Sequence, residues 1–177
     1  MNKFRTSPIA AALCVCLLSM PGQASADVIA DALSGMPANS WQKLNVNTFQ
    51  SVWTPFAQQP THSSPSSNIS AWSGAAWDSR RGNLLIFGGD IGEEEGNEVY
   101  VFSGKTGLWS RGASPSQITS TNGVTHTVDG AMTAPLSGES WDNVVFLKNV
   151  DRMAVIGVSR NGSTWQDPNT RLRTGPY

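Results

Sequence analysis

The chain has 177 residues, a length that is typical of one domain. It carries 12 Lys and Arg against 13 Asp and Glu, so its formal net charge is −1. This weak negative charge argues against a nucleic-acid-binding protein, because such a protein needs a basic surface. Short β-rich runs alternate with Gly, Ser, Asn and Pro, and long helical patterns are missing, which indicates an all-β fold.

The first 26 residues have the pattern of a secretory signal peptide. Lys3 and Arg5 precede an apolar run over residues 8–20, and residues 24–26 are the small residues of a cleavage site. The run is shorter than the about 20 residues that span a bilayer, so we expect no membrane span. We expect cleavage between Ala26 and Asp27, and a secreted or periplasmic protein. Both cysteines lie in this leader, so the mature chain has no disulfide framework.

Residues 27–70 form an N-terminal segment in this interpretation. Asp27 is a candidate cap for one or two helical turns. A strand is predicted near Trp41, over residues 41–45, before an irregular stretch that is rich in aromatic residues and proline. Residues 61–70 are rich in Ser, Pro and Thr, and this composition predicts a loop.

The first regular part, residues 71–111, is predicted to be an antiparallel meander of four strands joined by short turns. The second strand is fully apolar and stops at a glycine pair, as expected of a central strand. In the third strand, valines alternate with aromatic residues, which predicts packing on both faces. The strands are expected over residues 73–78, 84–87, 97–102 and 108–111.

The sequence also contains a degenerate internal repeat. The pattern Ser-Gly-x-x-Trp-Asp ends at Asp78 and recurs 64 positions later, ending at Asp142. An apolar strand followed by glycine recurs after it, and so does a turn before a tryptophan. Three matching elements in the same order indicate a second, incomplete copy over residues 136–177. The matched positions are Trp77 with Trp141, Gly88 with Gly157, and Trp109 with Trp165.

The first copy resembles the kelch repeat, in which a glycine pair ends the second strand and Tyr and Trp follow on the third and fourth. The resemblance is close in the first copy and degenerate in the second, where Gly157 has no second glycine beside it. It implies a β-propeller of four-stranded antiparallel blades, similar to the central domain of galactose oxidase. The structural motif residues are Gly88, Gly89, Tyr100, Trp109, Trp77, Trp141, Gly157 and Trp165.

The implied ring is incomplete, because propellers contain about 4–8 blades and about two are present here. Gly88 and Gly89 are expected to let neighbouring blades approach closely, since they lack a Cβ. Tyr100 and Trp109 are expected to pack one blade on the next. We therefore expect the remaining propeller blades, or self-association, to cover the two outer faces.

The sequence predicts no catalytic residue, no bound cofactor and no metal site. Residues 90–98 hold five carboxylates, but their spacing does not match a calcium loop, so we interpret them as a solvated loop. His62 and His126 lie in polar connectors, and neither has a second histidine nearby to share a metal. Asp78 and Asp142 precede turns, so we interpret them as turn residues rather than a catalytic pair.

Two functions remain open. The first is a secreted or periplasmic kelch-type β-propeller that acts as a binding module for a protein or a glycan. The second is a fragment of a carbohydrate-active propeller enzyme, epimerase-like or oxidase-like, whose active site lies on missing blades. The binding module is favoured because no catalytic residues are recognised. A galactose oxidase site also needs a tyrosine–cysteine crosslink, and the mature chain has no cysteine.

Overall fold

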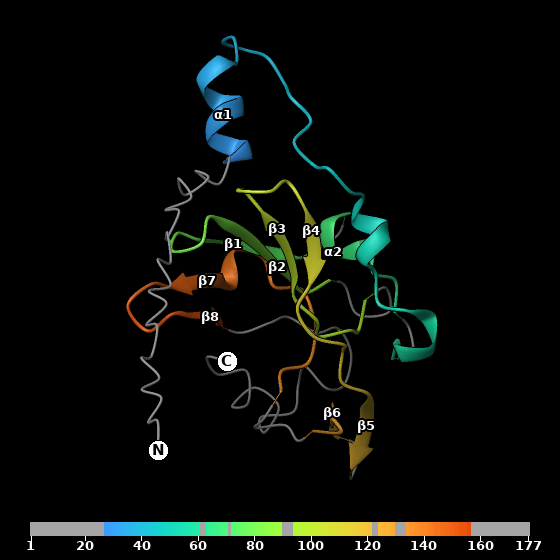
Figure 1. Ribbon diagram of the computed structural model, residues 1–177. Helices are drawn as coiled ribbons and strands as arrows, with labels where there is room; N and C mark the ends of the chain where they lie inside the picture. Colours follow the sequence, from blue (N-terminus) through green and yellow to red (C-terminus); the bar gives the residue numbers. More distant parts are fainter. Residues whose placement is uncertain are drawn as a thin grey trace, which may run out of the picture.

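The structure is a computed structural model that describes residues 27–60, 63–70, 72–89, 94–121, 124–129 and 134–156. Antiparallel β-sheet dominates these residues, and the helical segments between the strands are short (Figure 1). This agrees with the expected all-β class. Within the described ranges, no helix is long and apolar enough to cross a membrane.

The described elements alternate between strands and short helical turns. The strands are β1 (Gly74–Asp78), β2 (Asn83–Phe87), β3 (Tyr100–Ser103), β4 (Trp109–Arg111), β5 (Ile118–Thr121), β6 (Val124–Thr127), β7 (Val144–Leu147) and β8 (Arg152–Val155). The helical segments are α1 (Val28–Gly35), α2 (Ser67–Ser70) and the 3-10 turns η1 (Phe49–Val52), η2 (Phe56–Gln58) and η3 (Trp141–Asn143).

Strands β1 to β4 form one antiparallel sheet in chain order, as predicted for residues 71–111. Asp78 starts the first turn, because its Oδ1 accepts hydrogen bonds from the backbone N–H groups of Arg80 and Arg81 at 3.0 and 3.2 Å. The turn role predicted for Asp78 is therefore confirmed. Gly107 closes the β3–β4 turn with a φ of +68°, which glycine adopts without strain.

One face of this sheet is covered by the N-terminal segment. The ring of Phe49, in η1, packs against Tyr100 and Trp109 with centroid distances of 4.7 and 5.0 Å. Tyr100 is fully buried and Phe49 nearly so. The two motif aromatics were expected to contact a neighbouring blade, and in the described chain they contact this segment instead. An aromatic side chain from the same chain thus provides the apolar cover that the sheet requires.

The predicted strand over residues 41–45 is wrong, since these residues belong to no strand and Trp41 is 99% exposed. The segment contacts the edge strand β4 through the ring of Phe49, and the side chain of Asn47 bonds to the β4 backbone. Asn47 Oδ1 accepts from Trp109 N at 2.7 Å, and Asn47 Nδ2 donates to Trp109 O at 3.0 Å. These bonds satisfy the backbone N–H and C=O groups of Trp109 at the edge of β4 without a further strand. The two groups are therefore not available to pair with another strand.

Helix α1 stands at the end of the first sheet, on the side of the β3–β4 turn (Figure 1). The cap predicted at Asp27 is confirmed, because its Oδ1 accepts a hydrogen bond from Ala30 N at 3.1 Å. The N–H groups of Val28 and Ile29 donate to the carbonyls of residues 105 and 104 at 3.1 and 3.0 Å. The first N–H groups of the helix, which have no partner inside it, are satisfied in this way.

The other face of the first sheet packs on the two-stranded sheet β7–β8. The buried core between the sheets consists of Ala76 and Phe87 from the first and Val144 and Val155 from the second. Val144 Cγ2 is so close to Gly74 that a Cβ there would lie 2.6 Å from it. The two sheets are therefore in tight contact through their first strands, β1 and β7.

The second copy of the repeat begins differently from the first. Its Trp141 and Asp142 lie in η3, whereas Trp77 and Asp78 lie in β1, so the repeated pattern forms a different element in each copy. The first strand of this sheet is β7, which pairs with β8 from Val144↔Val155 to Leu147↔Arg152. Asp142 is exposed and does not share the buried turn position of Asp78.

A hairpin replaces part of the polar connector that was predicted between the two copies. Strands β5 and β6 pair antiparallel, from Ile118↔Thr127 to Thr121↔Val124. The run of β-branched Ile, Thr and Val residues in these strands favours the extended backbone. This hairpin lies away from the first sheet, at the opposite end of the molecule from α1 (Figure 1).

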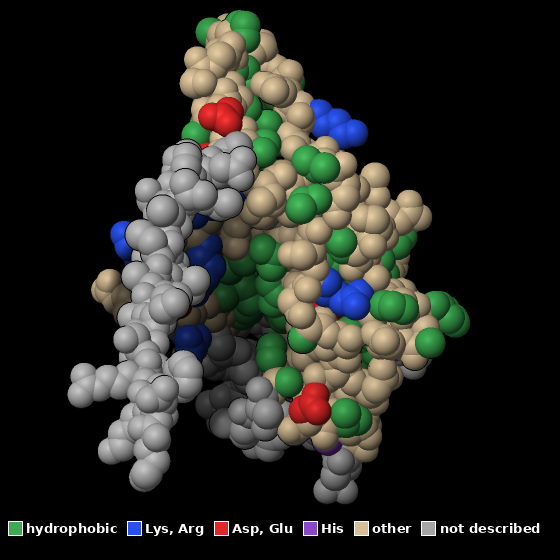
Figure 2. All heavy atoms as spheres, in the orientation of Figure 1, with side chains coloured by type: hydrophobic (Ala, Val, Ile, Leu, Met, Phe, Trp, Pro, Cys, Tyr) green, Lys and Arg blue, Asp and Glu red, His purple; other side chains and the backbone are tan. Residues whose placement is uncertain are grey.

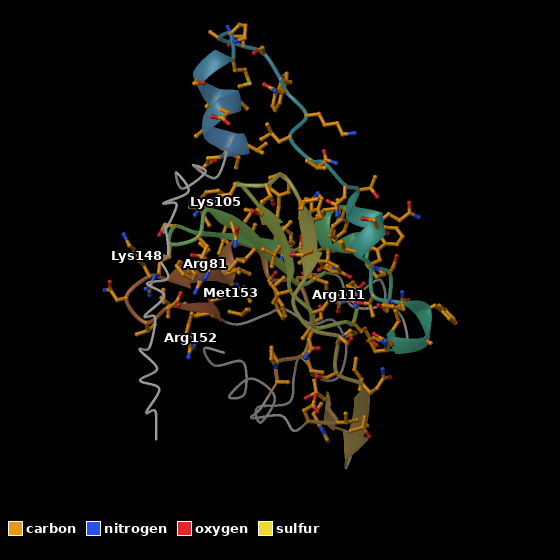
Figure 3. The ribbon with its side chains drawn as sticks, in the orientation of Figure 1. Arg81, Lys105, Arg111, Lys148, Arg152 and Met153 are labelled. Carbon is orange, nitrogen blue, oxygen red and sulfur yellow. The ribbon has the colours of Figure 1, made fainter. Side chains whose placement is uncertain are left out.

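An apolar hollow lies beside the second sheet. Figure 2 shows hydrophobic side chains around this hollow, with Lys and Arg side chains next to it. Met153, labelled in Figure 3, lies in the same part of the view, and it is partly buried against the core together with Val99 and Phe146. Leu85 and Val101, which are paired in register on this face of the first sheet, are only half-buried. The described second sheet thus covers only part of this face.

Candidate functional site

Two exposed tryptophans from neighbouring sheets contact each other. Trp72 stands just before β1 and Trp141 lies in η3, before β7, and their ring centroids are 4.8 Å apart with the planes at 55°. Their exposed fractions are 45% and 50%, although large aromatic side chains usually bury most of their surface. We call this pair the Trp72–Trp141 surface.

Both tryptophans have a left-handed backbone. The φ angles are +59° at Trp72 and +46° at Trp141. This conformation is rare for bulky residues and costs on the order of 1–3 kcal/mol at each position. Residues held in such strained conformations cluster at ligand-binding and active sites. The strain therefore marks this surface as a candidate binding site.

The backbone beneath the surface is anchored by hydrogen bonds between the two sheets. Ser140 N donates to Trp72 O at 2.9 Å, and Ser140 Oγ donates to Phe87 O at 2.7 Å. Gly89 N donates to Gly138 O at 3.2 Å. Ser140 is fully buried, so these bonds are shielded from water. The two indole rings thus stand on a fixed backbone, as a binding site requires.

Gly88 makes this close approach possible. Its φ is +93°, and a Cβ at this position would collide with Ser140 Oγ and lie 2.7 Å from Gly138 O. A Cβ on Gly89 would lie 2.6 Å from the Cβ of Glu94. At the glycine pair, therefore, the segment that starts the second sheet passes directly over the end of β2.

Glu139 places a carboxylate beside the aromatic rings. Trp141 Nε1 donates a hydrogen bond to Glu139 Oε2 at 3.3 Å. Glu139 is half-buried, and no Lys or Arg of the described residues forms an ion pair with it. The Trp72–Trp141 surface therefore combines an apolar platform with a hydrogen-bond acceptor that carries negative charge.

The acidic loop is buried at its described end. Glu94 and Glu98 are 0% and 2% exposed, so the interpretation of a solvated loop is wrong for these two residues. Glu98 Oε1 accepts hydrogen bonds from Thr54 Oγ1 at 2.6 Å and from Tyr100 OH at 2.9 Å. Hydroxyl donors thus take the place of water, which is the condition for burying a carboxylate.

Glu94 has its own donors. Its Oε1 accepts from Gly96 N at 2.6 Å and from Ser63 Oγ at 2.9 Å. A Cβ at Gly96 would collide with Glu98 Oε2 and lie 2.5 Å from Glu94 Oε1, so the two carboxyl groups converge on this glycine. Among the described residues, the second oxygen of each group has no hydrogen-bond partner. The pair is closed off from solvent and holds the N-terminal segment to the acidic loop.

Burial and the negative charge of Glu98 both affect the pKa of Glu94. Burial, and then the charge of Glu98, raise the pKa of Glu94 to about 7. Burial also raises the pKa of Tyr100, whose hydroxyl donates to Glu98. Two neighbouring carboxyl groups cannot both ionise at low cost, so Glu94 keeps its proton to a higher pH than an exposed glutamate does.

Arg81 joins the two sheets at the end opposite to Gly88. Its guanidinium donates to Asp151 through Nη1 and Nη2, both at 2.7 Å, and to Asp78 Oδ2 through Nη1 at 2.9 Å (Figure 3). Burial raises the pKa of Asp78, but the hydrogen bonds from Arg81 and Arg80 lower it more, so the net shift is downward. The hydrogen bonds from Arg81 likewise lower the pKa of Asp151. This cluster connects the chain between β1 and β2 to the chain between β7 and β8.

Among the other residues singled out in the sequence, Trp77 and His126 are described, and neither contributes to the Trp72–Trp141 surface. Trp77 is half-exposed on β1. His126 Nδ1 lies 2.8 Å from Thr127 O, within the hairpin. Gly157, Trp165 and His62 lie outside the described residues. In the described part of the chain, no group of three or more His, Cys, Asp and Glu side chains is placed to hold a metal ion.

Sequence reasoning assigned Trp141 a structural role and did not single out Trp72 or Glu139. Both tryptophans adjoin the repeated Ser-Gly pattern. Trp72 precedes Ser73-Gly74, and Trp141 follows Ser137-Gly138 by three residues. The two positions are not equivalent in the repeat, because Trp141 matches Trp77, so the repeat by itself does not predict that the two rings meet.

Comparisons with known proteins do not assign the chain to a family. No protein-family model, no curated protein and no solved structure matches it.

Proposed function

We propose that this chain forms part of a secreted or periplasmic kelch-type β-propeller that acts as a binding module for a protein or a glycan. The signal-peptide pattern of residues 1–26 supports the location. The four-stranded sheet in chain order, with apolar side chains on both faces, supports a propeller blade.

The contact between the sheets also supports the proposal. Neighbouring blades of a propeller pack face to face with their first strands side by side. Here β1 and β7 pack together through Ala76 and Val144. The apolar hollow beside β7–β8 has the character of a surface on which further strands would pack (Figure 2).

The observation that carries the binding function is the Trp72–Trp141 surface. Folding usually hides aromatic rings, yet here two indoles from different sheets remain about half exposed on a strained and anchored backbone. Strained residues persist only where the surrounding structure holds them in place. Aromatic side chains dominate the energetics of binding surfaces, because each buries about 150–250 Å².

The test compares three forms of the full chain: wild type, the double variant Trp72→Ala/Trp141→Ala, and Trp41→Ala. The immobilised probes are galactomannan, hydroxyethyl cellulose, polygalacturonate, gelatin and casein. We expect the wild type and Trp41→Ala to bind at least one probe equally, because Trp41 is exposed and lies outside the surface. The double variant should bind that probe at least tenfold more weakly.

Thermal unfolding of each variant shows whether it is folded. The proposed function is wrong if a folded double variant binds every probe as tightly as the wild type does. It is equally wrong if no probe is bound by any form of the chain.

A further inference from the structure

We infer that the Trp72–Trp141 surface binds a neutral glycan, with a pyranose ring stacked on the indoles and its hydroxyl groups donating to Glu139. This inference rests on the proposed binding function and specifies its ligand.

The geometry of the two rings favours stacking over enclosure. With centroids 4.8 Å apart and planes at 55°, the rings contact each other and leave no space for a sugar between them, so a sugar would stack on the outer face of a ring. The axial C–H groups of a pyranose form an apolar face about as large as a six-membered aromatic ring. An indole quadrupole has a negative face, which attracts the slightly positive C–H groups of such a sugar.

Glu139 provides the polar half of the recognition. Its Oε2 already accepts from Trp141 Nε1 at 3.3 Å, and this bond directs the carboxylate toward the ring pair. Sugar hydroxyls are hydrogen-bond donors, and a bond to an ionised acceptor is about twice as strong as a neutral one. A sugar that stacks on Trp141 therefore finds an acceptor at the edge of the same ring.

The charge of Glu139 distinguishes between classes of glycan. A uronic acid or another acidic sugar would bring a second negative charge to a half-buried carboxylate, and like charges in close contact repel. No described cation forms an ion pair with Glu139 to offset this repulsion. This repulsion disfavours an acidic glycan and favours a neutral one over it.

The size of the surface argues against a folded protein as the ligand. Two half-exposed indoles offer on the order of 200 Å² of aromatic area. A stable protein–protein interface buries about 800 Å² on each partner. A single sugar ring matches the area of the pair much better.

The experiment titrates the full chain with galactomannan, hydroxyethyl cellulose, polygalacturonate, gelatin and choline chloride, and follows binding by calorimetry. We expect at least one neutral polysaccharide to bind, and polygalacturonate, gelatin and choline to give no signal. Trp72→Ala/Trp141→Ala should weaken the neutral polysaccharide at least tenfold. Trp41→Ala should leave its affinity unchanged.

Glu139→Gln supplies a second readout that loss of folding cannot imitate. Removal of the negative charge should weaken the neutral polysaccharide about three- to tenfold and raise the binding of polygalacturonate. The glycan inference is overturned if only gelatin, choline or polygalacturonate binds in a way that depends on the two tryptophans, although the binding function would then stand. Absence of every signal would overturn both proposals.

Discussion

The two sheets begin with the same six-residue pattern and fold it differently. In the first copy, residues 74–78 form β1 and pair with β2 over five positions, with Trp77 opposite Leu84. In the second copy, the pattern ends in the 3-10 turn η3, and its Ser140 bonds to the carbonyls of Trp72 and Phe87. The first copy is part of a sheet, and the second copy attaches one sheet to another.

The difference shows that a repeated pattern specifies a position in the fold more firmly than it specifies a conformation. Ser137-Gly138 passes over the end of β2, where Gly88 and Gly89 leave room for it. In this contact, the Gly138 carbonyl and the Ser140 N–H bond to Gly89 and Trp72, so these two groups are not available to pair with a strand. In the first copy, the backbone groups of the equivalent residues are available to pair with β2. The same sequence pattern therefore forms a strand there, β1.

The largest expected effect comes from closing the space at Gly88. Gly88→Ala would place a Cβ against Ser140 Oγ and Gly138 O at a φ of +93°, so crowding and backbone strain act together. We expect the free energy of unfolding to fall by about 4 kcal/mol. Urea denaturation followed by fluorescence measures this change. Because both tryptophans depend on the same contact, ligand binding at the Trp72–Trp141 surface should weaken as well.

Gly82→Ala is the matched control for this prediction. Gly82 also has a positive φ, +71°, but nothing lies within 4 Å of the position of its Cβ. It should therefore show the backbone strain alone, a loss of about 1 kcal/mol. Equal losses for the two variants would mean that the close approach of the two sheets at Gly88 contributes nothing to stability.

The second prediction concerns the buried carboxyl pair, which the described part of the second sheet does not repeat. Because the pKa of Glu94 rises from 4.5 to about 7 on folding, the folded chain binds this proton more tightly than the unfolded chain. Between pH 5 and pH 8, the free energy of unfolding should therefore be highest at pH 5 and fall as the pH rises. The loss is on the order of 3 kcal/mol.

Glu94→Gln should remove this loss, because the amide cannot ionise and its oxygen can still accept from Gly96 N and Ser63 Oγ. The measurement is urea denaturation at pH 5, 6, 7 and 8 for the wild type, the variant and the control Asp31→Asn, an exposed carboxylate in α1. Asp78 and Asp151 do not disturb the window, because their lowered pKa values place their effect at lower pH. A pH dependence that persists in Glu94→Gln would contradict the assignment.

The smallest expected effect concerns the edge of the first sheet. Asn47→Ala removes both hydrogen bonds to the backbone of Trp109, so we expect a loss of about 1–2 kcal/mol. The uncovered edge of β4 should also promote association at high concentration, which size-exclusion chromatography with light scattering detects. Asn45→Ala is the control, since Asn45 bonds only within the segment, from Nδ2 to Asn47 O at 2.8 Å. If both variants remain monomeric and equally stable, Asn47 does not protect the edge.

Local features of the chain were predictable from the sequence. The apolar run before Gly88 formed β2, the Asp78 turn formed as expected, and Asp27 capped α1. Each of these depends on side chains within a few residues of one another. The strand predicted at residues 41–45 did not form: Trp41 is exposed to solvent, and the segment bonds to β4 through the side chain of Asn47.

The all-β class, the order of the strands in the first sheet and the turns between them follow from local patterns in the sequence, because periodicity and turn chemistry act over short stretches of chain. The burial of Glu94 and Glu98, and the contact between Trp72 and Trp141, depend on how distant segments pack. These outcomes join residues that are far apart in the chain, such as Thr54 with Glu98. Whether a carboxylate meets water or a hydroxyl group depends on which segment covers it, and that choice is made by packing.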